Sequence, residues 1–110
     1  MSAAKSLEQI QPNQKISVQM RAVLSIISSD PFLMDAVLPF IDFKNEAIEW
    51  DEIFRLPLSS GHRGACQWAF SLWTDNIREN ANPFEAALSM DSNLQSGILK
   101  ALKLRWGIRG

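Results

Sequence analysis

The segment from Ala65 to Ile77 is the feature that most constrains how this chain can fold. Its apolar side chains point in almost every direction around an α-helix: Ala65, Cys66, Trp68, Ala69, Phe70, Leu72, Trp73 and Ile77. Only a narrow polar line, which begins at Gln67 and ends at Arg78, is left to face water. A helix of this kind must be enclosed by other elements. We therefore predict that residues from about 60 to 77 form the central helix of the molecule.

Capping residues and apolar spacing predict further helices around this centre. Asp30-Pro31-Phe32 and Asn82-Pro83-Phe84 each place a capping side chain before a proline at the first helical position. Asn45 is predicted to cap another helix, with Glu46 in its first turn. An additional helix is expected to follow Ile16, where apolar residues begin to recur at helical spacing.

The last predicted helix begins at Asp91 or Ser92 and ends at Gly107. Its expected apolar line consists of Leu94, Ile98, Leu102 and Trp106. No window alternates like a strand, and residues 36–43 come nearest to doing so. We therefore expect an all-α fold of about five helices in a single domain, residues 16–110, preceded by a loosely ordered arm, residues 1–15.

The charge balance and the cysteine content limit the function classes. Eleven Lys and Arg residues against twelve Asp and Glu residues provide no overall attraction to nucleic acid or to an anionic membrane. Cys66 is the single cysteine, and the polar first residues do not resemble a secretory signal, so we expect a cytosolic protein. The longest apolar run, residues 36–41, is far shorter than the roughly 20 residues that span a bilayer, so no membrane partner is expected.

The start of the predicted central helix is a candidate anion site formed by Ser60, Gly61, His62 and Arg63. Backbone N–H groups at a helix N-terminus, with hydroxyl groups and an arginine beside them, can bind phosphate or carboxylate. The alternative is that the serines cap the helix, the glycines allow a neighbour to pack closely, and His62 and Arg63 are solvated. The spacing matches no phosphate-binding loop, and we favour this alternative.

His62 and Cys66 lie four residues apart, so both could face one side of a helix and act as a catalytic pair. A small buried side chain is the better account of Cys66, because its neighbours along the chain are apolar. We expect neither catalytic residues nor a metal site, since a single His and a single Cys cannot form a structural zinc centre. No cofactor is expected.

Opposite charges gather in two parts of the chain. Seven acidic residues and one lysine lie between positions 30 and 52, whereas Lys100, Lys103, Arg105 and Arg109 follow the last acid, Asp91. Arg105 falls on the apolar side of its helix and therefore needs a carboxylate partner. We expect that partner to be Asp42, Glu49 or Asp51 of the same chain; alternatively, the acidic and basic parts of two chains meet, head to tail or across a two-fold axis.

Trp50 and Trp106 lie near predicted helix ends beside charged residues, so they are candidate interaction anchors, together with Lys100, Lys103 and Arg105. These observations predict a small interaction or regulatory module without catalytic activity, whose partner is another protein or a second copy in a homodimer. The alternative is nucleic-acid binding through the basic C-terminal helix. A ligand-binding domain at the Ser60–Arg63 segment ranks third.

Overall fold

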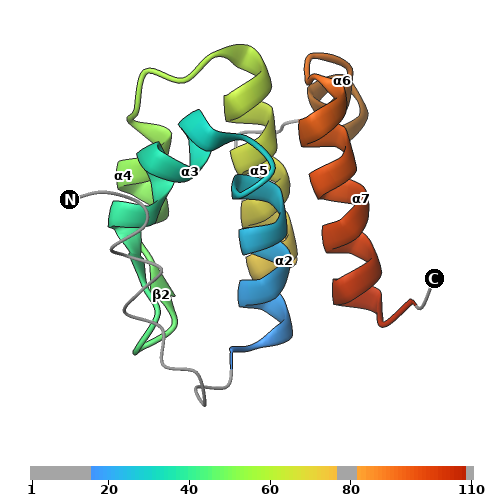
Figure 1. The fold of residues 1–110 in the computed structure, drawn as a ribbon. Helices are drawn as coiled ribbons and strands as arrows, with labels where there is room; N and C mark the ends of the chain where they lie inside the picture. Colours follow the sequence, from blue (N-terminus) through green and yellow to red (C-terminus); the bar gives the residue numbers. More distant parts are fainter. Residues whose placement is uncertain (1–15, 77–81, 109–110) are drawn as a thin grey trace.

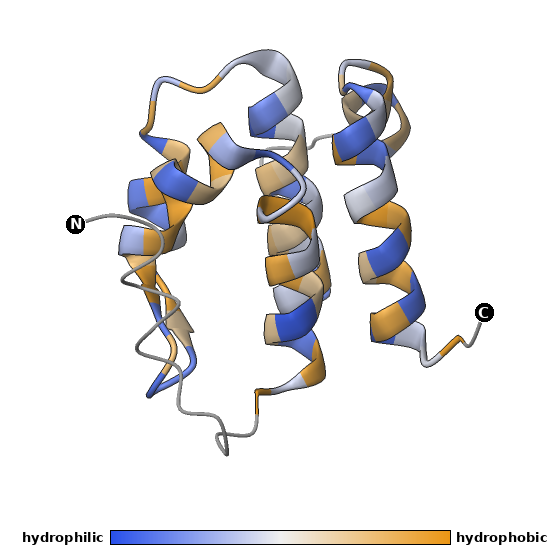
Figure 2. Ribbon diagram, viewed as in Figure 1, coloured by the Kyte–Doolittle hydropathy of each residue, from blue (hydrophilic) through white to orange (hydrophobic). Residues whose placement is uncertain are grey.

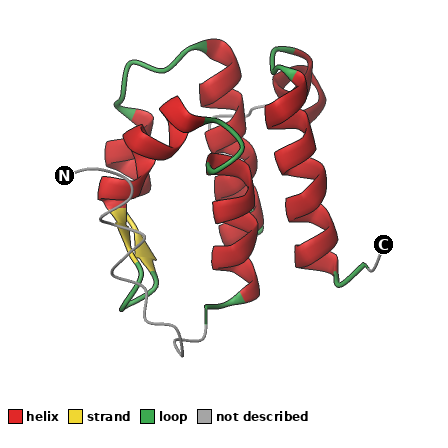
Figure 3. Ribbon diagram, in the orientation of Figure 1, coloured by secondary structure: helices red, strands yellow, loops and turns green. Residues whose placement is uncertain are grey.

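The computed structural model describes residues 16–76 and 82–108, and within these ranges the chain forms six α-helices, a 3₁₀ turn and a short hairpin. Figures 1 and 3 show a helical protein in which the hairpin is the single sheet of the part described, which confirms the predicted all-α class. The elements are α2 (Val18–Ile27), α3 (Pro31–Val37), η1 (Leu38–Phe40), β1 (Ile41–Asp42), β2 (Ala47–Ile48), α4 (Trp50–Phe54), α5 (Ser60–Thr74), α6 (Pro83–Leu88) and α7 (Ser92–Trp106).

Helix α5 occupies the centre, as predicted, because it packs against α2, α4, α6 and α7. Figure 1 shows α2 beside α5, with the hairpin and α4 on one side of this pair and α7 on the other. Helices α2 and α7 pack closely and run in opposite directions. Helix α5 ends at Thr74, and Asp75 adopts a left-handed backbone conformation (φ 61°) that stops it. Ile77 and the arm of residues 1–15 lie outside the described residues.

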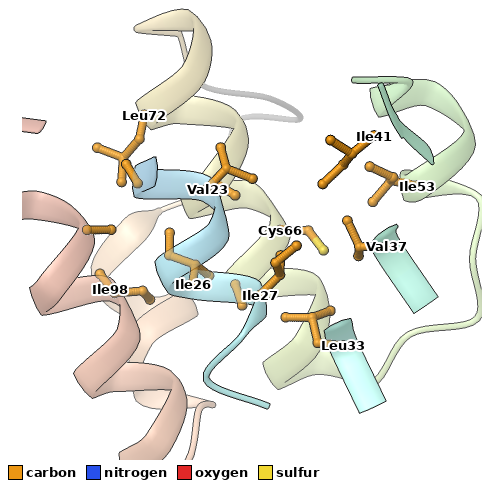
Figure 4. Close-up of a cluster of buried hydrophobic side chains, with 14 of the residues drawn as sticks. Val23, Ile26, Ile27, Leu33, Val37, Ile41, Ile53, Cys66, Leu72 and Ile98 are labelled. Carbon is orange, nitrogen blue, oxygen red and sulfur yellow. The ribbon is translucent and has the colours of Figure 1, made fainter. Parts of the chain in front are cut away.

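The core lies between the apolar faces of α2, α3, α5 and α7. Its largest fully buried side chains are Met20, Val23, Ile26, Ile27, Leu33, Val37, Leu38, Ile53 and Cys66. Figure 4 shows Ile26 and Ile27 of α2 turned toward different neighbours, with Ile26 near Ile98 and Ile27 near the Cys66 thiol. Orange apolar positions alternate with blue polar positions along α7 in Figure 2, because that helix has one buried side and one side in water.

Most of the local capping predictions agree with the structure. The Asp30 carboxylate accepts a hydrogen bond from Leu33 N–H, the Asn82 side chain accepts from Phe84 and Glu85 N–H, and Asp91, rather than Ser92, caps α7. Gly107 ends α7 with a positive φ of 70°. Each cap depends on residues within four positions of it, so the sequence alone contains the needed information.

The helix predicted from Asn45 does form, but it begins at Trp50 as α4, and the Asn45 cap is wrong because the chain around Asn45 completes a β-hairpin first. Ile41 pairs with Ile48 and Asp42 with Ala47 in an antiparallel register. The Asp42 carboxylate accepts bonds from the backbone and side chain of Asn45, and Glu46 takes a left-handed φ of 49°, which no α-helix can contain. The Glu46 side chain accepts from Ser17 N–H at 2.8 Å, so a contact with the start of α2 helps to hold the turn.

Candidate functional site

The N-terminus of α5 carries the four candidate anion-binding residues, and the structure directs them to different neighbours. Ser59 caps the helix by accepting from His62 N–H, and Ser60 is exposed. Gly61 is buried against the end of α6, where a Cβ atom would lie 2.8 Å from the Ser89 carbonyl oxygen. An electron-rich oxygen therefore covers the backbone at Gly61, which is unfavourable for an anion there.

His62 lies in a corner between α3 and α5. Its Nε2 is 3.1 Å from Oδ2 of Asp30, and its ring stacks on Phe32 with the centroids 5.0 Å apart. Both polar side chains are mostly buried, and Nδ1 has no hydrogen-bond partner among the described residues. Burial raises the pKa of Asp30, but the Leu33 N–H bond and the contact with His62 outweigh it and lower that pKa overall. The negative charge in this corner is thus the protein's own carboxylate.

Arg63 turns toward α4 and away from Ser60. Its Nη1 donates to the Phe54 carbonyl oxygen at 3.1 Å, and its guanidinium lies 5.8 Å from the centre of the Phe54 ring. Among the four candidates, only Ser60 is exposed, whereas His62 and Arg63 are held by groups on other elements. Anion binding by this segment stays a prediction.

Cys66 is buried between α5 and its neighbours, as Figure 4 shows. Burial raises the pKa of its thiol to about 12, and the charge of Arg63 offsets only a small part of this effect. A thiol with so high a pKa is almost wholly protonated near neutral pH, so it is a poor nucleophile. The interpretation of Cys66 as a small core residue is therefore the better supported one.

Arg105 is paired, but with a carboxylate that the sequence analysis did not consider. Its guanidinium lies 3.2 Å from Asp75 and also donates to the carbonyl oxygen of Leu72, both at the C-terminal end of α5. This corrects the expectation that Asp42, Glu49 or Asp51 supplies the partner. The physical reason is the position of α7, which lies against the end of α5, whereas the hairpin and α4 lie on the other side of the molecule.

The other candidates on α7 differ in exposure. Lys100 faces solvent, Lys103 is half-buried, and Trp106 is 66% exposed. The predicted apolar line along α7 is therefore wrong at its end. Steps of four residues advance about 40° beyond a full turn, so Trp106 lies about 120° around the helix from Leu94. Gly97, Ile98 and Ala101 complete the buried face instead.

Asp42, Glu49 and Asp51 lie around two pockets that share Glu49. The larger, of about 460 Å³, is lined by Ile48, Glu49, Trp50, Asp51, Glu52 and Phe70. The smaller, of about 230 Å³, is lined by Pro39, Phe40, Ile41, Asp42, Ala47 and Glu49. Hydrogen bonds from the Asn45 side chain and backbone lower the pKa of Asp42, so this carboxylate is ionised at neutral pH.

Trp50 is half-buried, so it is less available as an anchor than Trp106. Its ring meets Phe70 edge to face at 5.4 Å and lies 6.3 Å from Phe54. Its Nε1 is buried, and the described parts of the chain offer it no hydrogen-bond acceptor. The wall of the larger pocket thus combines aromatic rings with the carboxylates of Glu49 and Asp51.

The sequence analysis missed the exposed apolar residues of α6. Phe84 is 77% exposed and Leu88 is 82% exposed. Helix α6 packs on α5 through small residues instead, since a Cβ atom on Gly64 would lie 3.1 Å from the Cβ of Ala86. The available signal was the Ala86-Ala87 pair, because small residues allow close helix packing while the large residues beside them point away.

Comparison with known protein families, with curated proteins and with solved structures finds no match to this chain. Within residues 16–76 and 82–108, no helix combines the length and the apolar character needed to cross a membrane. The same ranges contain no group of three or more His, Cys, Asp or Glu residues placed to hold a metal ion.

Proposed function

We propose that this protein is a protein–protein interaction module that docks through α6 and catalyses no reaction. The observation that carries the proposal is the exposure of Phe84 and Leu88, at 77% and 82%. Residues four apart lie on one face of a helix, so these two side chains form a continuous apolar ridge. Burying such a side chain contributes about 1.5–3 kcal/mol, and a partner with an apolar groove would gain this from each of the two.

Helix α6 is held in a fixed position, which favours binding. Ala86 packs on Gly64, the Trp68 indole donates to the Pro83 carbonyl oxygen, and Gln95 of α7 donates to the Ala87 carbonyl oxygen. A ridge that is already ordered loses little conformational entropy when a partner binds. The fixed position of α6 therefore favours docking through Phe84 and Leu88.

The roles of His62 and Cys66 support a binding function rather than an enzymatic one. His62 is held by Asp30 and stacked on Phe32, and the Cys66 thiol is buried and protonated. The single histidine and the single cysteine of the sequence are thus held in contacts between helices. A cytosolic location accords with a free, buried cysteine.

A pull-down from the protein's own cells tests the proposal. The wild type, the double variant Phe84→Ser/Leu88→Ser and the control Val18→Ser/Leu99→Ser are compared, since Val18 and Leu99 are also exposed apolar residues. We expect the wild type and the control to retain the same partner and the α6 variant to lose it, with unchanged circular dichroism. Equal retention by all three proteins would contradict the proposal.

Nucleic-acid binding through α7 is the second candidate function. It is supported by an exposed tryptophan, Trp106, which could stack on a base, beside the exposed Lys100. The pairing of Arg105 with Asp75 leaves fewer cations for phosphate contact. We expect Lys100→Glu/Lys103→Glu to abolish any binding and its salt dependence, measured by fluorescence anisotropy with single- and double-stranded oligonucleotides. No binding by the wild type at low salt would exclude this function.

A further inference from the structure

The molecule carries two surfaces of complementary chemistry on opposite sides. The first is the acidic groove, defined here as the pocket of about 460 Å³ lined by Ile48, Glu49, Trp50, Asp51, Glu52 and Phe70. The second is the basic end of α7, defined as Lys100, Lys103 and Trp106. Figure 1 shows α4, which bears Trp50, Asp51 and Glu52 of the groove, on one side of α2 and α5, and α7 on the other.

The acidic groove joins an apolar wall to a negative rim. Trp50 and Phe70 supply the wall, with their rings 5.4 Å apart, and Ile48 is half-buried beside them. Glu49, Asp51 and Glu52 are exposed on the rim. Arg55 pairs with Glu52 at 2.9 Å and offsets the charge of that residue, so Glu49 is the exposed acid that a cation would contact. Such a pocket suits an occupant with an aromatic or aliphatic body and a positive charge.

The basic end of α7 has those two properties. Lys100, Lys103 and Trp106 follow at spacings of three, so they are neighbours on the helix surface. The indole of Trp106 is 66% exposed, and the sequence contains no acidic residue after Asp91. An exposed tryptophan beside cations is the kind of anchor that fills an aromatic pocket at a protein interface.

The two surfaces cannot meet within one chain, because α2 and α5 lie between them. We propose that the occupant of the acidic groove is the basic end of α7 of a second copy of this protein, with Trp106 in the groove and Lys100 facing Glu49. Because the two surfaces lie on opposite sides of the molecule, this contact is head to tail, so a bound pair still offers one free groove and one free α7. The association therefore continues beyond a dimer, into a ring or an open chain.

The contact between Lys100 and Glu49 predicts that two variants, each weakened alone, associate when they are mixed. Lys100→Glu should cancel the positive charge at the end of α7, because a glutamate then stands beside Lys103, and Glu49→Lys should weaken the negative rim and leave α7 basic. Each variant alone is expected to self-associate about tenfold more weakly than the wild type. In a mixture, the groove of the Lys100→Glu chain again meets the basic α7 of the Glu49→Lys chain. In the opposite contact the two substituted side chains carry opposite charges and also attract each other. Association should therefore return.

Sedimentation velocity over a range of concentrations at low and high salt measures these effects. The wild type is expected to form species larger than a dimer at low salt and to dissociate at high salt. Trp106→Ser should weaken association by about 30-fold or more, the effect of removing a central anchor. Arg21→Glu and Asp35→Lys change the net charge by the same amounts as the two test variants, on exposed positions of α2 and α3, and should associate like the wild type.

Three results would overturn the inference: a monomer at every concentration at low salt, a closed dimer, or mixed variants that associate no better than each alone. Phe84→Ser/Leu88→Ser is expected to self-associate normally, because α6 takes no part in this contact. A monomeric chain that still binds another protein through Phe84 and Leu88 would refute head-to-tail association and leave the proposed function intact.

Discussion

Replacing Gly97 with alanine tests the closest approach between two helices of this fold. A Cβ atom at Gly97 would lie 2.7 Å from both Cβ and Oγ of Ser29 and 2.8 Å from the carbonyl oxygen of Ser25. Rotation of the Ser29 side chain moves its Oγ but not its Cβ, and the Ser25 oxygen belongs to the backbone of α2. Helices α2 and α7 would have to separate by about 0.6 Å for that contact to reach the 3.4 Å of ordinary packing.

Two effects of opposite sign determine the result. Overpacking of a closely packed interface costs about 1–3 kcal/mol. Alanine in place of glycine inside a helix stabilises by about 1 kcal/mol, because glycine loses more backbone entropy on folding. We expect a net loss of about 1 kcal/mol in the free energy of unfolding, which corresponds to a fall of about 4 °C in Tm for a domain of this size.

Urea unfolding followed by tryptophan fluorescence, together with thermal unfolding, measures this change. Ser96→Ala is the matched control, since Ser96 is the preceding residue of α7 and faces solvent, and it should change stability by less than about 0.5 kcal/mol. Gly97→Val should be less stable than Gly97→Ala, because it adds further atoms at the same contact. A Gly97→Ala protein that is more stable than the wild type by about 1 kcal/mol would refute the close approach of α2 and α7.

Three further predictions concern single side chains. Cys66 should resist a thiol reagent at pH 8 in the native protein and react fully once urea unfolds it, because burial raises its pKa to about 12; rapid labelling of the native state would contradict this. Asp75→Asn should lower the free energy of unfolding by less than about 1 kcal/mol, since its carboxylate is 76% exposed. Arg105→Met should lower it more in urea unfolding, because it also loses the bond to the Leu72 carbonyl oxygen. Equal effects would show that this bond contributes nothing. The pKa of Asp30 in the folded state lies below its ordinary value of 3.8, so the stability that its ionised carboxylate contributes is present above pH 3.8 and is lost as the pH falls through the folded-state pKa. Asp30→Asn should therefore flatten the acid side of the plot of unfolding free energy against pH. An unchanged plot would contradict this role of Asp30.

Sequence reasoning predicted part of the candidate sites. Helical periodicity placed Arg105 on the apolar side of the last helix, where it needs a carboxylate, but wrongly placed Trp106 on that side too. Trp106 was a candidate anchor only because it lies at a helix end beside charged residues. Sequence reasoning could not identify Asp75 as the partner, since that depends on where the end of α5 lies relative to α7. Phe84 and Leu88 were also missed, because a short helix shows from its own pattern neither which face packs nor how much of it is covered.

The sequence by itself determined the local events of this fold. Asp30, Asn82, Asp91 and Gly107 start or stop helices through bonds to residues at most four positions away, and the apolar segment after Ala65 required a central helix. Only the tertiary structure decided that Asn45 lies in a hairpin. There the bond from Ser17 N–H to the Glu46 carboxylate joins residues 29 positions apart, and no local pattern encodes it. The reason is physical: a cap is complete within one turn, whereas a long-range contact forms only after the whole chain has packed.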